Sequence, residues 1–393
     1  MIVSMSMQTR DSFPDILRGF ALLGIAMVNI QYFAVDTVSG FESLDLSNTG
    51  NSAATFIVMF LFQSKFYLLF SFLFGYSASY VIRGERSNRG RWLARSFGLI
   101  LFGVVHLVFL FHGDILFVYG VFGLLLAALY FRKTSTLKLW AWLLYLGTAG
   151  LFAVFSLLTY VGEAYLASKG KVLPDEEFVS GLDSALASGS FMEAAVARFD
   201  LWLVVAPQGF LLQGPLVFVA FLVGVLVARK DGLASGVNEL RIKTYAFWGL
   251  LLGLPLQFVA AWMFLINAQA EQYSLGLYLT SLTLNFVTAP ILSAGYVGTL
   301  WLIAQKLGGI SLLSAAGRHS LTIYIGQSVV FSILFSAWGL GLFAELNGAV
   351  VALIAFATWL ALSLLAMLNL RWRTKGPLEA ALTGISRLLS RSK

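Results

Sequence analysis

Two histidines and one aspartate lie in an otherwise apolar stretch at residues 96–120, SFGLILFGVVHLVFLFHGDILFVYG. They are His106, His112 and Asp114, and a further charged residue, Lys65, lies in an earlier apolar run. Ionisable side chains are costly at bilayer depth, so they face a protein interior or a water-filled cavity and often mark function. His106 suits general acid–base chemistry, which Asp114 could assist. Alternatively, His106, Asp114 and Lys65 bond one another and only fix the turn.

The first apolar segment carries a cation near one end and an amide near the other. Asp15 and Arg18 are three residues apart and can pair across one helical turn. Asn29 follows Arg18 by eleven residues, about three turns, so both lie on one helix face. The guanidinium fork of Arg18 favours a phosphate or another anion. Alternatively, Arg18 snorkels to the headgroups beside Asp15, and Asn29 bonds a neighbouring helix.

Another cation precedes a later apolar segment. Arg318 and His319 lie at a predicted helix N-terminus on the cytoplasmic side, where free N–H groups favour anions. A CoA phosphate fits this position, and Thr322 and Gln327 carry polar groups further into the segment. Alternatively, Arg318 only helps to set the topology.

Composition places the chain in the membrane. Of its 393 residues 59% are apolar and only 11% charged, and the mean hydropathy is +0.84, whereas soluble domains are about one quarter charged. The absence of cysteine excludes disulfides and thiolate-bound metals. With three histidines and no His-Glu-x-x-His spacing, no metal site is expected. No cleavable signal peptide is expected either.

Ten apolar runs have the length of about 17–25 residues that a membrane helix requires. They centre on residues 13–35, 53–82, 94–111, 114–131, 137–160, 205–228, 244–266, 276–305, 319–343 and 348–370. The eighth is long enough to be tilted or split near Pro290. The sequence therefore predicts an all-α, polytopic integral membrane protein with about ten transmembrane helices.

Lysine and arginine are distributed unequally between the two sets of connections. The connections on one side hold 21 of these residues and those on the other side hold three. Because Lys and Arg are enriched in cytoplasmic loops, both termini are predicted to be cytoplasmic. The net charge of +7 then reflects topology, and a nucleic-acid-binding face is excluded.

The predicted organisation has four parts. They are five helices with the main motifs (1–160), an outer loop with a candidate interfacial helix (161–204), five further helices (205–370) and a basic amphipathic cytoplasmic tail (371–393). In the outer loop, Phe191, Ala195, Phe199 and Trp202 fall on roughly one face of a helix. This pattern is typical of a helix lying on the membrane, although an ordinary linker fits as well.

Several motifs follow one another along nearly the whole chain. They are Asp15 through Asn29, Lys65 to Gly75, His106 with Gly113, Asp114, Ile115, Leu116 and Tyr119, Gly317 to Ser328, and Gly376 to Glu379. Together they resemble the YeiB-like family of bacterial membrane proteins, which contains a domain of unknown function. The resemblance implies a multi-pass protein of the bacterial cytoplasmic (inner) membrane.

This family is in turn similar to a larger group of transmembrane acyltransferases. The group includes the lysosomal heparan-alpha-glucosaminide N-acetyltransferase and bacterial enzymes that O-acylate surface polysaccharides. The shared element is an arginine and, eleven positions later, a polar residue, here Arg18 and Asn29. The polysaccharide enzymes usually have a histidine where this chain has Asn29. The resemblance therefore implies a base elsewhere, and His106 is the candidate.

The leading prediction is a membrane-embedded acyltransferase. Acyl-CoA or acetyl-CoA would enter from the cytoplasm, with its phosphates near Arg18, Arg318 and His319. His106 would act as a base or as a transient acyl carrier, helped by Asp114, while Asn29 polarises the thioester carbonyl. Further cavity-lining or structural residues are predicted to be Asp15, Lys65, Tyr119, Thr322 and Gln327.

Other functions fit the same residues. Ten spans with embedded His, Asp, Lys and Arg would also serve a proton-coupled transporter of a small organic solute. A lipid-binding or envelope-assembly protein without turnover is a third reading. The expected partners are membrane lipids and a small-molecule or envelope glycan or lipid acceptor, without nucleic acid, and a homodimer is left open.

Overall fold

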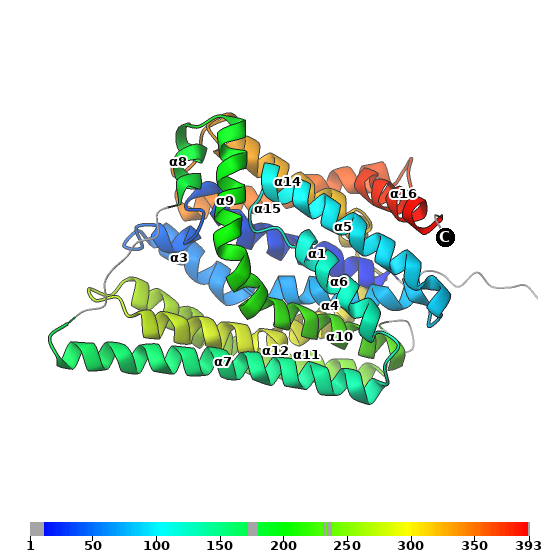
Figure 1. The fold of residues 1–393 in the computed structure, drawn as a ribbon, viewed down its shortest axis with the longest axis horizontal. Helices are drawn as coiled ribbons and strands as arrows, with labels where there is room; N and C mark the ends of the chain where they lie inside the picture. The colour runs from blue at the N-terminus through cyan, green and yellow to red at the C-terminus, as the bar shows by residue number, and fades with distance from the viewer. Residues whose placement is uncertain (1–11, 172–179, 231–232, 234–237, 392–393) are drawn as a thin grey trace, which may run out of the picture.

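The computed structural model of the chain describes residues 12–171, 180–230, 233 and 238–391. Within these residues every regular element is helical (Figure 1). The α-helices are α1 (Phe13–Asn29), α2 (Gln31–Ala34), α3 (Thr49–Ile57), α4 (Lys65–Ile82), α5 (Arg89–Phe109), α6 (Leu116–Leu129), α7 (Thr134–Ser168), α8 (Gly181–Ser188), α9 (Phe191–Gln208), α10 (Gly214–Lys230), α11 (Glu239–Ala268), α12 (Leu275–Leu307), α13 (Ser311–Arg318), α14 (Ser320–Phe335), α15 (Gly348–Asn369) and α16 (Pro377–Arg391).

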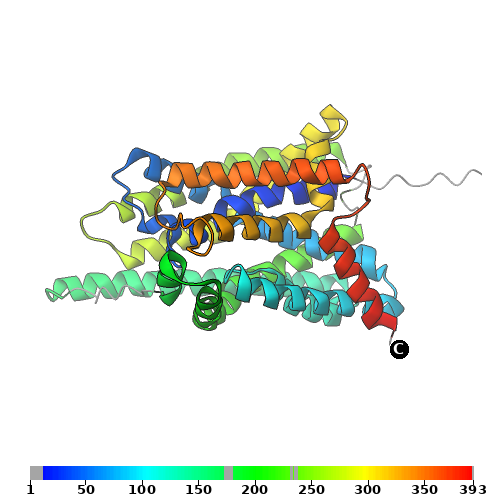
Figure 2. The same ribbon diagram turned by 90° about the horizontal axis from the view of Figure 1, so that it is seen from above.

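The long helices form one bundle whose axes run roughly along the length of the molecule (Figure 2). By length and composition, eight described segments can cross a membrane: Phe13–Ala34, Thr49–Ile82, Arg86–Phe109, Thr134–Ser168, Phe191–Lys230, Glu239–Ala268, Leu275–Leu307 and Gly348–Asn369. Two shorter apolar helices, α6 and α14, lie where the sequence predicts the remaining two spans. The predicted all-α, polytopic membrane class is therefore confirmed.

Helix α1 lies at the centre of the packing. It contacts α4, α13, α14 and α15, and most of its side chains are buried. A Cβ added to Gly19 of α1 would lie 2.0 Å from the carbonyl oxygen of Leu313 on α13, so only glycine allows this helix crossing. The charged and polar residues of α1 are thereby held at fixed positions inside the bundle.

Two of the predicted spans are interrupted by π-helical turns. Between α3 and α4 a π-helix (Val58–Phe62) is followed by Ser64, whose φ is +70°. Between α9 and α10 a second π-helix covers Gly209–Gln213. By contrast, α12 runs unbroken through Pro290, so the predicted option of a split at that proline is wrong.

The predicted interfacial helix overlaps with α8 and α9. Its second part is α9, which continues through the π-turn into α10, so the proposed boundary at residue 204 falls within a helix. The face of α9 that contacts the bundle includes Ala194 and Arg198, whereas Phe191 and Phe199 are more than one third exposed. Residues 172–179 of the predicted outer loop lie outside the described residues.

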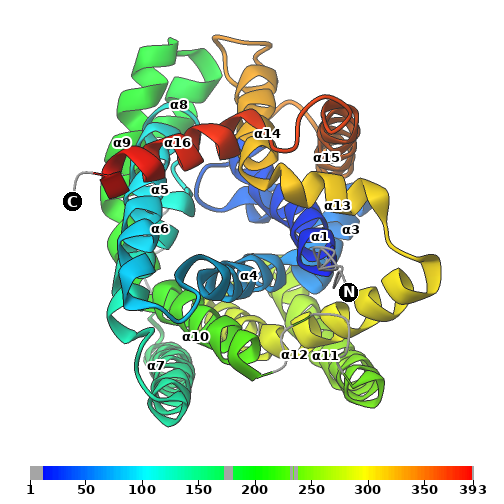
Figure 3. The same cartoon turned by 90° about the vertical axis from the view of Figure 1, so that its right-hand side faces the viewer.

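The basic tail contains an amphipathic helix, as the pattern predicts, but part of its apolar face contacts protein. Leu382 of α16 is buried against α5, next to Gly98. Seen from the end of the molecule, α16 lies across the bundle from α14 to α5 (Figure 3). Leu388 and Leu389, further along, remain exposed. The tail therefore covers the end of the bundle at which α1 begins.

Candidate functional site

His106 is held between two side chains from distant parts of the chain. It lies in the last turn of α5, and its Nδ1 is 2.8 Å from Oδ1 of Asp114, in the turn before α6. Its Nε2 is 2.9 Å from Oγ of Ser328 on α14. All three side chains are buried. The contact with Asp114 fits an Nδ1–H that donates to the carboxylate, and Ser328 holds the opposite side of the ring.

Asp114 also begins the next helix. Its Oδ2 accepts a hydrogen bond of 2.6 Å from the backbone N–H of Phe117, in the first turn of α6. A side chain on Gly103 of α5 would lie 2.3 Å from that same nitrogen, so the glycine allows α5 and α6 to approach closely. The α5–α6 hairpin thus fixes His106 and Asp114 relative to each other, and the carboxylate has a partner for each oxygen.

Asp114 lines a cavity of about 420 Å³, which is named the outer cavity after the predicted topology, whereas His106 lies behind Asp114 and does not line the cavity. The cavity also contains Asn29, at the end of α1, together with the amides and aromatic rings of Gln63, Gln208, Gln213, Tyr32, Tyr67 and Trp202. Among the described residues that line it, there is no Lys or Arg, and Asp114 is the sole carboxylate. The cavity therefore has polar groups set in a largely apolar lining, and the one carboxylate of its described lining is that of Asp114.

A second, inner cavity of about 230 Å³ has the opposite character. Arg18, Arg95, Arg318 and Lys375 line it, together with the two acids Asp15 and Glu379. The guanidinium of Arg18 donates to Oδ1 of Asp15 at 2.7 Å, as the spacing predicts. The Nε atoms of Arg95 and Arg318 are buried without a hydrogen-bond partner among the described residues. The cavity therefore has an excess of cations and retains N–H donors for an anion.

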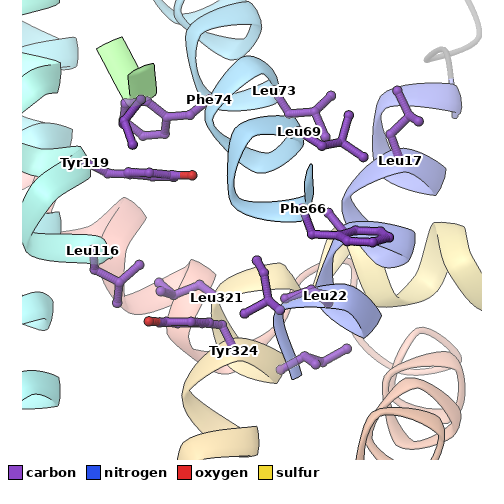
Figure 4. Packing of buried hydrophobic residues seen from close by; sticks show 14 of the residues in the cluster. Leu17, Leu22, Phe66, Leu69, Leu73, Phe74, Leu116, Tyr119, Leu321 and Tyr324 are labelled. Atoms are coloured by element: carbon purple, nitrogen blue, oxygen red, sulfur yellow. The ribbon is translucent and has the colours of Figure 1, made fainter. Parts of the chain in front are cut away.

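The two cavities share a wall. Ile115 and Tyr324 are the residues that line both. Figure 4 shows the Tyr324 phenol extending from α14 toward Leu116 of α6, and its oxygen lies 3.3 Å from the backbone nitrogen of Ile115. The Tyr324 ring lies beside His106, with 5.0 Å between ring centroids. The buried His106–Asp114 pair is therefore located at the boundary between the cation-rich inner cavity and the outer cavity, whose described lining has no Lys or Arg.

The N-terminus of α14 already has an anionic partner within the chain. Glu379 of α16 accepts from the backbone N–H groups of Leu321 and Thr322 at 2.6 and 3.1 Å, and from the Thr322 hydroxyl at 2.6 Å. His319 is buried and bonds the carbonyl of Ala315 and the amide of Asn369. The structure therefore leaves Arg318 as the residue of this predicted anion site that lines the inner cavity.

Three other predicted residues bond within the bundle. The side-chain nitrogen of Lys65 is fully buried and donates to the carbonyl of Met59 in the π-turn at 2.8 Å, and not to Asp114 as one of the predicted alternatives has it. Gln327 donates to the Leu22 carbonyl at 3.2 Å. The Tyr119 hydroxyl lies 2.8 Å from Oγ of Ser71, and the residue also lines the inner cavity. Within the described residues, no group of three or more His, Cys, Asp or Glu side chains could hold a metal ion.

His112 differs from His106 in its surroundings. It lies in the turn outside the membrane-spanning helices, where burial, reinforced by the charge of Arg198, lowers its pKa to about 4. Because the folded state disfavours the charged imidazole, its contribution to stability is complete above the ordinary pKa of 6.5 and is lost as the pH falls toward 4.

We expect the protein to lose up to roughly 3 kcal/mol of stability through this residue between pH 6.5 and pH 4. Thermal unfolding in detergent across this range should show a steeper acid loss for the wild type than for His112→Gln. Equal slopes would contradict the prediction.

The sequence interpretation missed three residues of the site: Arg95, Tyr324 and Ser328. Arg95 precedes His106 by eleven residues, the same spacing as Arg18 and Asn29, and this would have placed Arg95 and His106 on one helix face. Tyr324 and Ser328 are four residues apart and so share a face of α14. The spacing shows that the residues of each pair share a helix face, but it does not show that this face lines the site.

Comparison with known proteins supports the family resemblance. The family model described as "Protein of unknown function (DUF418)" matches residues 227–385. The uncharacterized protein YxaH of Bacillus subtilis (strain 168) is 29% identical, over 93% of this chain and 91% of its own length. The uncharacterized protein YeiB of Escherichia coli (strain K12) is 26% identical, over 93% of each chain. An uncharacterized 39.9 kDa protein in the amylase 3' region of Bacillus acidopullulyticus is 36% identical, over 30% of this chain and 33% of its own.

Proposed function

Since the chain belongs to the YeiB-like family of membrane proteins, we propose that it is an acyltransferase of the bacterial inner membrane. In this proposal an acyl group passes from acyl-CoA in the inner cavity to a hydroxyl or amine acceptor in the outer cavity. The observation that carries the proposal is the shared wall of the two cavities, at which the buried Asp114–His106 pair lies.

The inner cavity suits a phosphate-bearing donor. Four cations oppose two acids there, and Arg guanidinium groups bind phosphate oxygens through paired N–H donors. Glu379 already neutralises the N-terminus of α14, so the phosphates would bind to Arg18, Arg95 and Arg318 instead. The acyl end of the donor would then reach past Ile115 and Tyr324.

The outer cavity suits an uncharged or cationic acceptor. Its amide and aromatic lining has hydrogen-bond donors and acceptors but no cation that would favour an acid. The acceptor proton passes to Asp114, the group that lines the cavity, as the acceptor oxygen or nitrogen bonds to the acyl carbon. The carbon–sulfur bond breaks, and the proton is then returned to the thiolate of CoA.

In this scheme His106 is a positioning residue. It lies behind Asp114 and holds Oδ1 of the carboxylate through Nδ1–H, while Ser328 fixes the ring from the other side. The hydrogen bond keeps the carboxylate aimed at the cavity and stabilises it as its charge changes. The proposed roles of His106 and Asp114 are thus exchanged relative to those expected from the sequence, where His106 is the base and Asp114 assists it.

The proposal is tested with purified protein in lipid nanodiscs, labelled acetyl-CoA and envelope extracts as acceptors. Label appearing in an extract component, together with release of CoA, supports it. Failure to bind or consume any acyl-CoA contradicts it. Uptake of a solute into proteoliposomes that depends on a proton gradient, without chemical change of the solute, would favour a transporter.

The change Arg95→Gln is expected to raise KM for acyl-CoA by tenfold or more. A hydrogen bond to a charged group contributes about 1.5–3 kcal/mol, which corresponds to about 10–100-fold in binding. Initial rates against donor concentration measure the effect. Arg91→Gln, an exposed arginine on the same helix, is the control. Equal KM values for both variants would place the donor elsewhere.

A further inference from the structure

Helix α4 begins inside the bundle, at the wall of the outer cavity. The span that contains it is broken by the π-turn and by Ser64, and Ser64, Phe66 and Tyr67 all line that cavity. The first turn of a helix leaves backbone N–H groups without intrahelical partners, and no side chain caps this one. Because helix dipoles are positive at the N-terminus, the break brings positive potential to the cavity.

Two residues of this segment that line the outer cavity have hydroxyl groups without partners among the described residues. Ser64 is 2% exposed, and its Oγ has no hydrogen-bond partner among the described residues. The hydroxyl of Tyr67, in the first turn of α4, is likewise buried and has no hydrogen-bond partner in the described part of the chain. Buried polar atoms are nearly always hydrogen-bonded, so two such groups lining one cavity indicate a ligand that accepts hydrogen bonds.

The backbone conformation of Ser64 also suggests a functional role for this segment. Its φ of +70° is unfavourable for a residue with a side chain, and glycine would adopt it more readily. Lys65, the next residue, anchors the break by donating to the Met59 carbonyl, and Asn285 of α12 donates to the same oxygen at 3.1 Å. The break is therefore held by its own contacts, and none of them engages the Ser64 hydroxyl.

We infer that the start of α4, with the Ser64 and Tyr67 hydroxyls, stabilises the negative charge that develops on the acyl carbonyl oxygen during transfer. This inference rests on the proposed function. When the acceptor adds to the acyl carbon, the carbonyl electron pair moves to the oxygen, and the two hydroxyls donate to it. The C=O bond re-forms as the thiolate leaves. None of the described residues that line the cavity is a Lys or Arg that could perform this task.

Tyr67→Phe tests the inference with little structural disturbance. It removes one unpartnered oxygen and retains the ring, so the melting temperature should stay the same or rise. An interaction made mainly in the transition state lowers kcat and leaves KM unchanged, and loss of one such donor typically reduces kcat by about 10²-fold. Ser64→Gly, which suits the positive φ, should show the same pattern.

Ser79→Ala is the matched control. Its Oγ is also buried and unpartnered on α4, but Ser79 lines neither cavity. Full kcat in both Tyr67→Phe and Ser64→Gly, or an equal fall in Ser79→Ala, would overturn the inference while leaving the acyltransferase intact. If Ser64→Gly does not fold, Tyr67→Phe alone decides. A wild-type protein that transfers no acyl group would instead refute the proposed function itself.

A spectroscopic readout separates this role from a purely structural one. With acetyl-CoA carrying a ¹³C-labelled carbonyl, hydrogen bonding at the start of α4 should lower the carbonyl stretching frequency of the bound donor. The frequency should return toward the free value in Tyr67→Phe and remain low in Ser79→Ala. An identical frequency in wild type and Tyr67→Phe would contradict the inference.

Discussion

Asp114→Asn is expected to reduce acyl transfer by about 10²–10⁴-fold, the range typical of a lost general base. The amide retains the shape of the carboxylate but cannot take up the acceptor proton. It also loses the charge-assisted hydrogen bonds from His106 and from the Phe117 N–H. Because Asp114 lines the outer cavity and not the inner one, KM for acyl-CoA should stay nearly constant.

The measurement is the rate of acyl transfer at saturating donor, with donor binding measured separately. Asp200→Asn, an exposed acid on α9, is the control for removing one negative charge from the protein. A rate within a few-fold of wild type would exclude Asp114 as the proton acceptor. His106→Gln should give a smaller loss of rate and shift the pH profile, since His106 acts through Asp114.

The parts of the site that are local in sequence could be predicted. His106 and Asp114 are eight residues apart and joined by a tight hairpin, so their contact depends on one turn. Arg18 and Asp15 lie one helical turn apart, and their ion pair follows from that spacing. Periodicity and length likewise locate the apolar helices, because each membrane helix satisfies its own backbone hydrogen bonds.

Contacts between distant segments could not be predicted in this way. Ser328 reaches His106 across 222 residues, and nothing in the spacing of either motif specifies which helices meet. Glu379 occupies the N-terminus of α14 because the tail helix packs against α5 and α14, whereas its amphipathic pattern equally suits a lipid surface. The hydrogen-bond partners of His106 and of the α14 N-terminus therefore depend on how distant helices pack, which the local sequence pattern does not specify.

The close crossing of α1 and α13 can be tested by a single substitution at Gly317. Gly317 lies so close to α1 that a Cβ there would be 1.8 Å from the carbonyl oxygen of Asp15, a backbone atom that cannot rotate away. Gly317→Ala must therefore push the helices apart, at a cost near or above the upper end of the about 1–3 kcal/mol seen for overpacked cores. The melting temperature should fall by several degrees.

The same substitution should also weaken donor binding. Asp15 and Arg18 lie on α1, and Arg318 follows Gly317 directly, so separating the helices widens the inner cavity between its cations. We expect a higher KM for acyl-CoA together with the lower melting temperature. Gly147→Ala, in the middle of α7 with open space around its Cβ, should be neutral or slightly stabilising. If Gly317→Ala melts like Gly147→Ala, the two helices do not cross as closely as described, and the cationic cavity between them loses its structural basis.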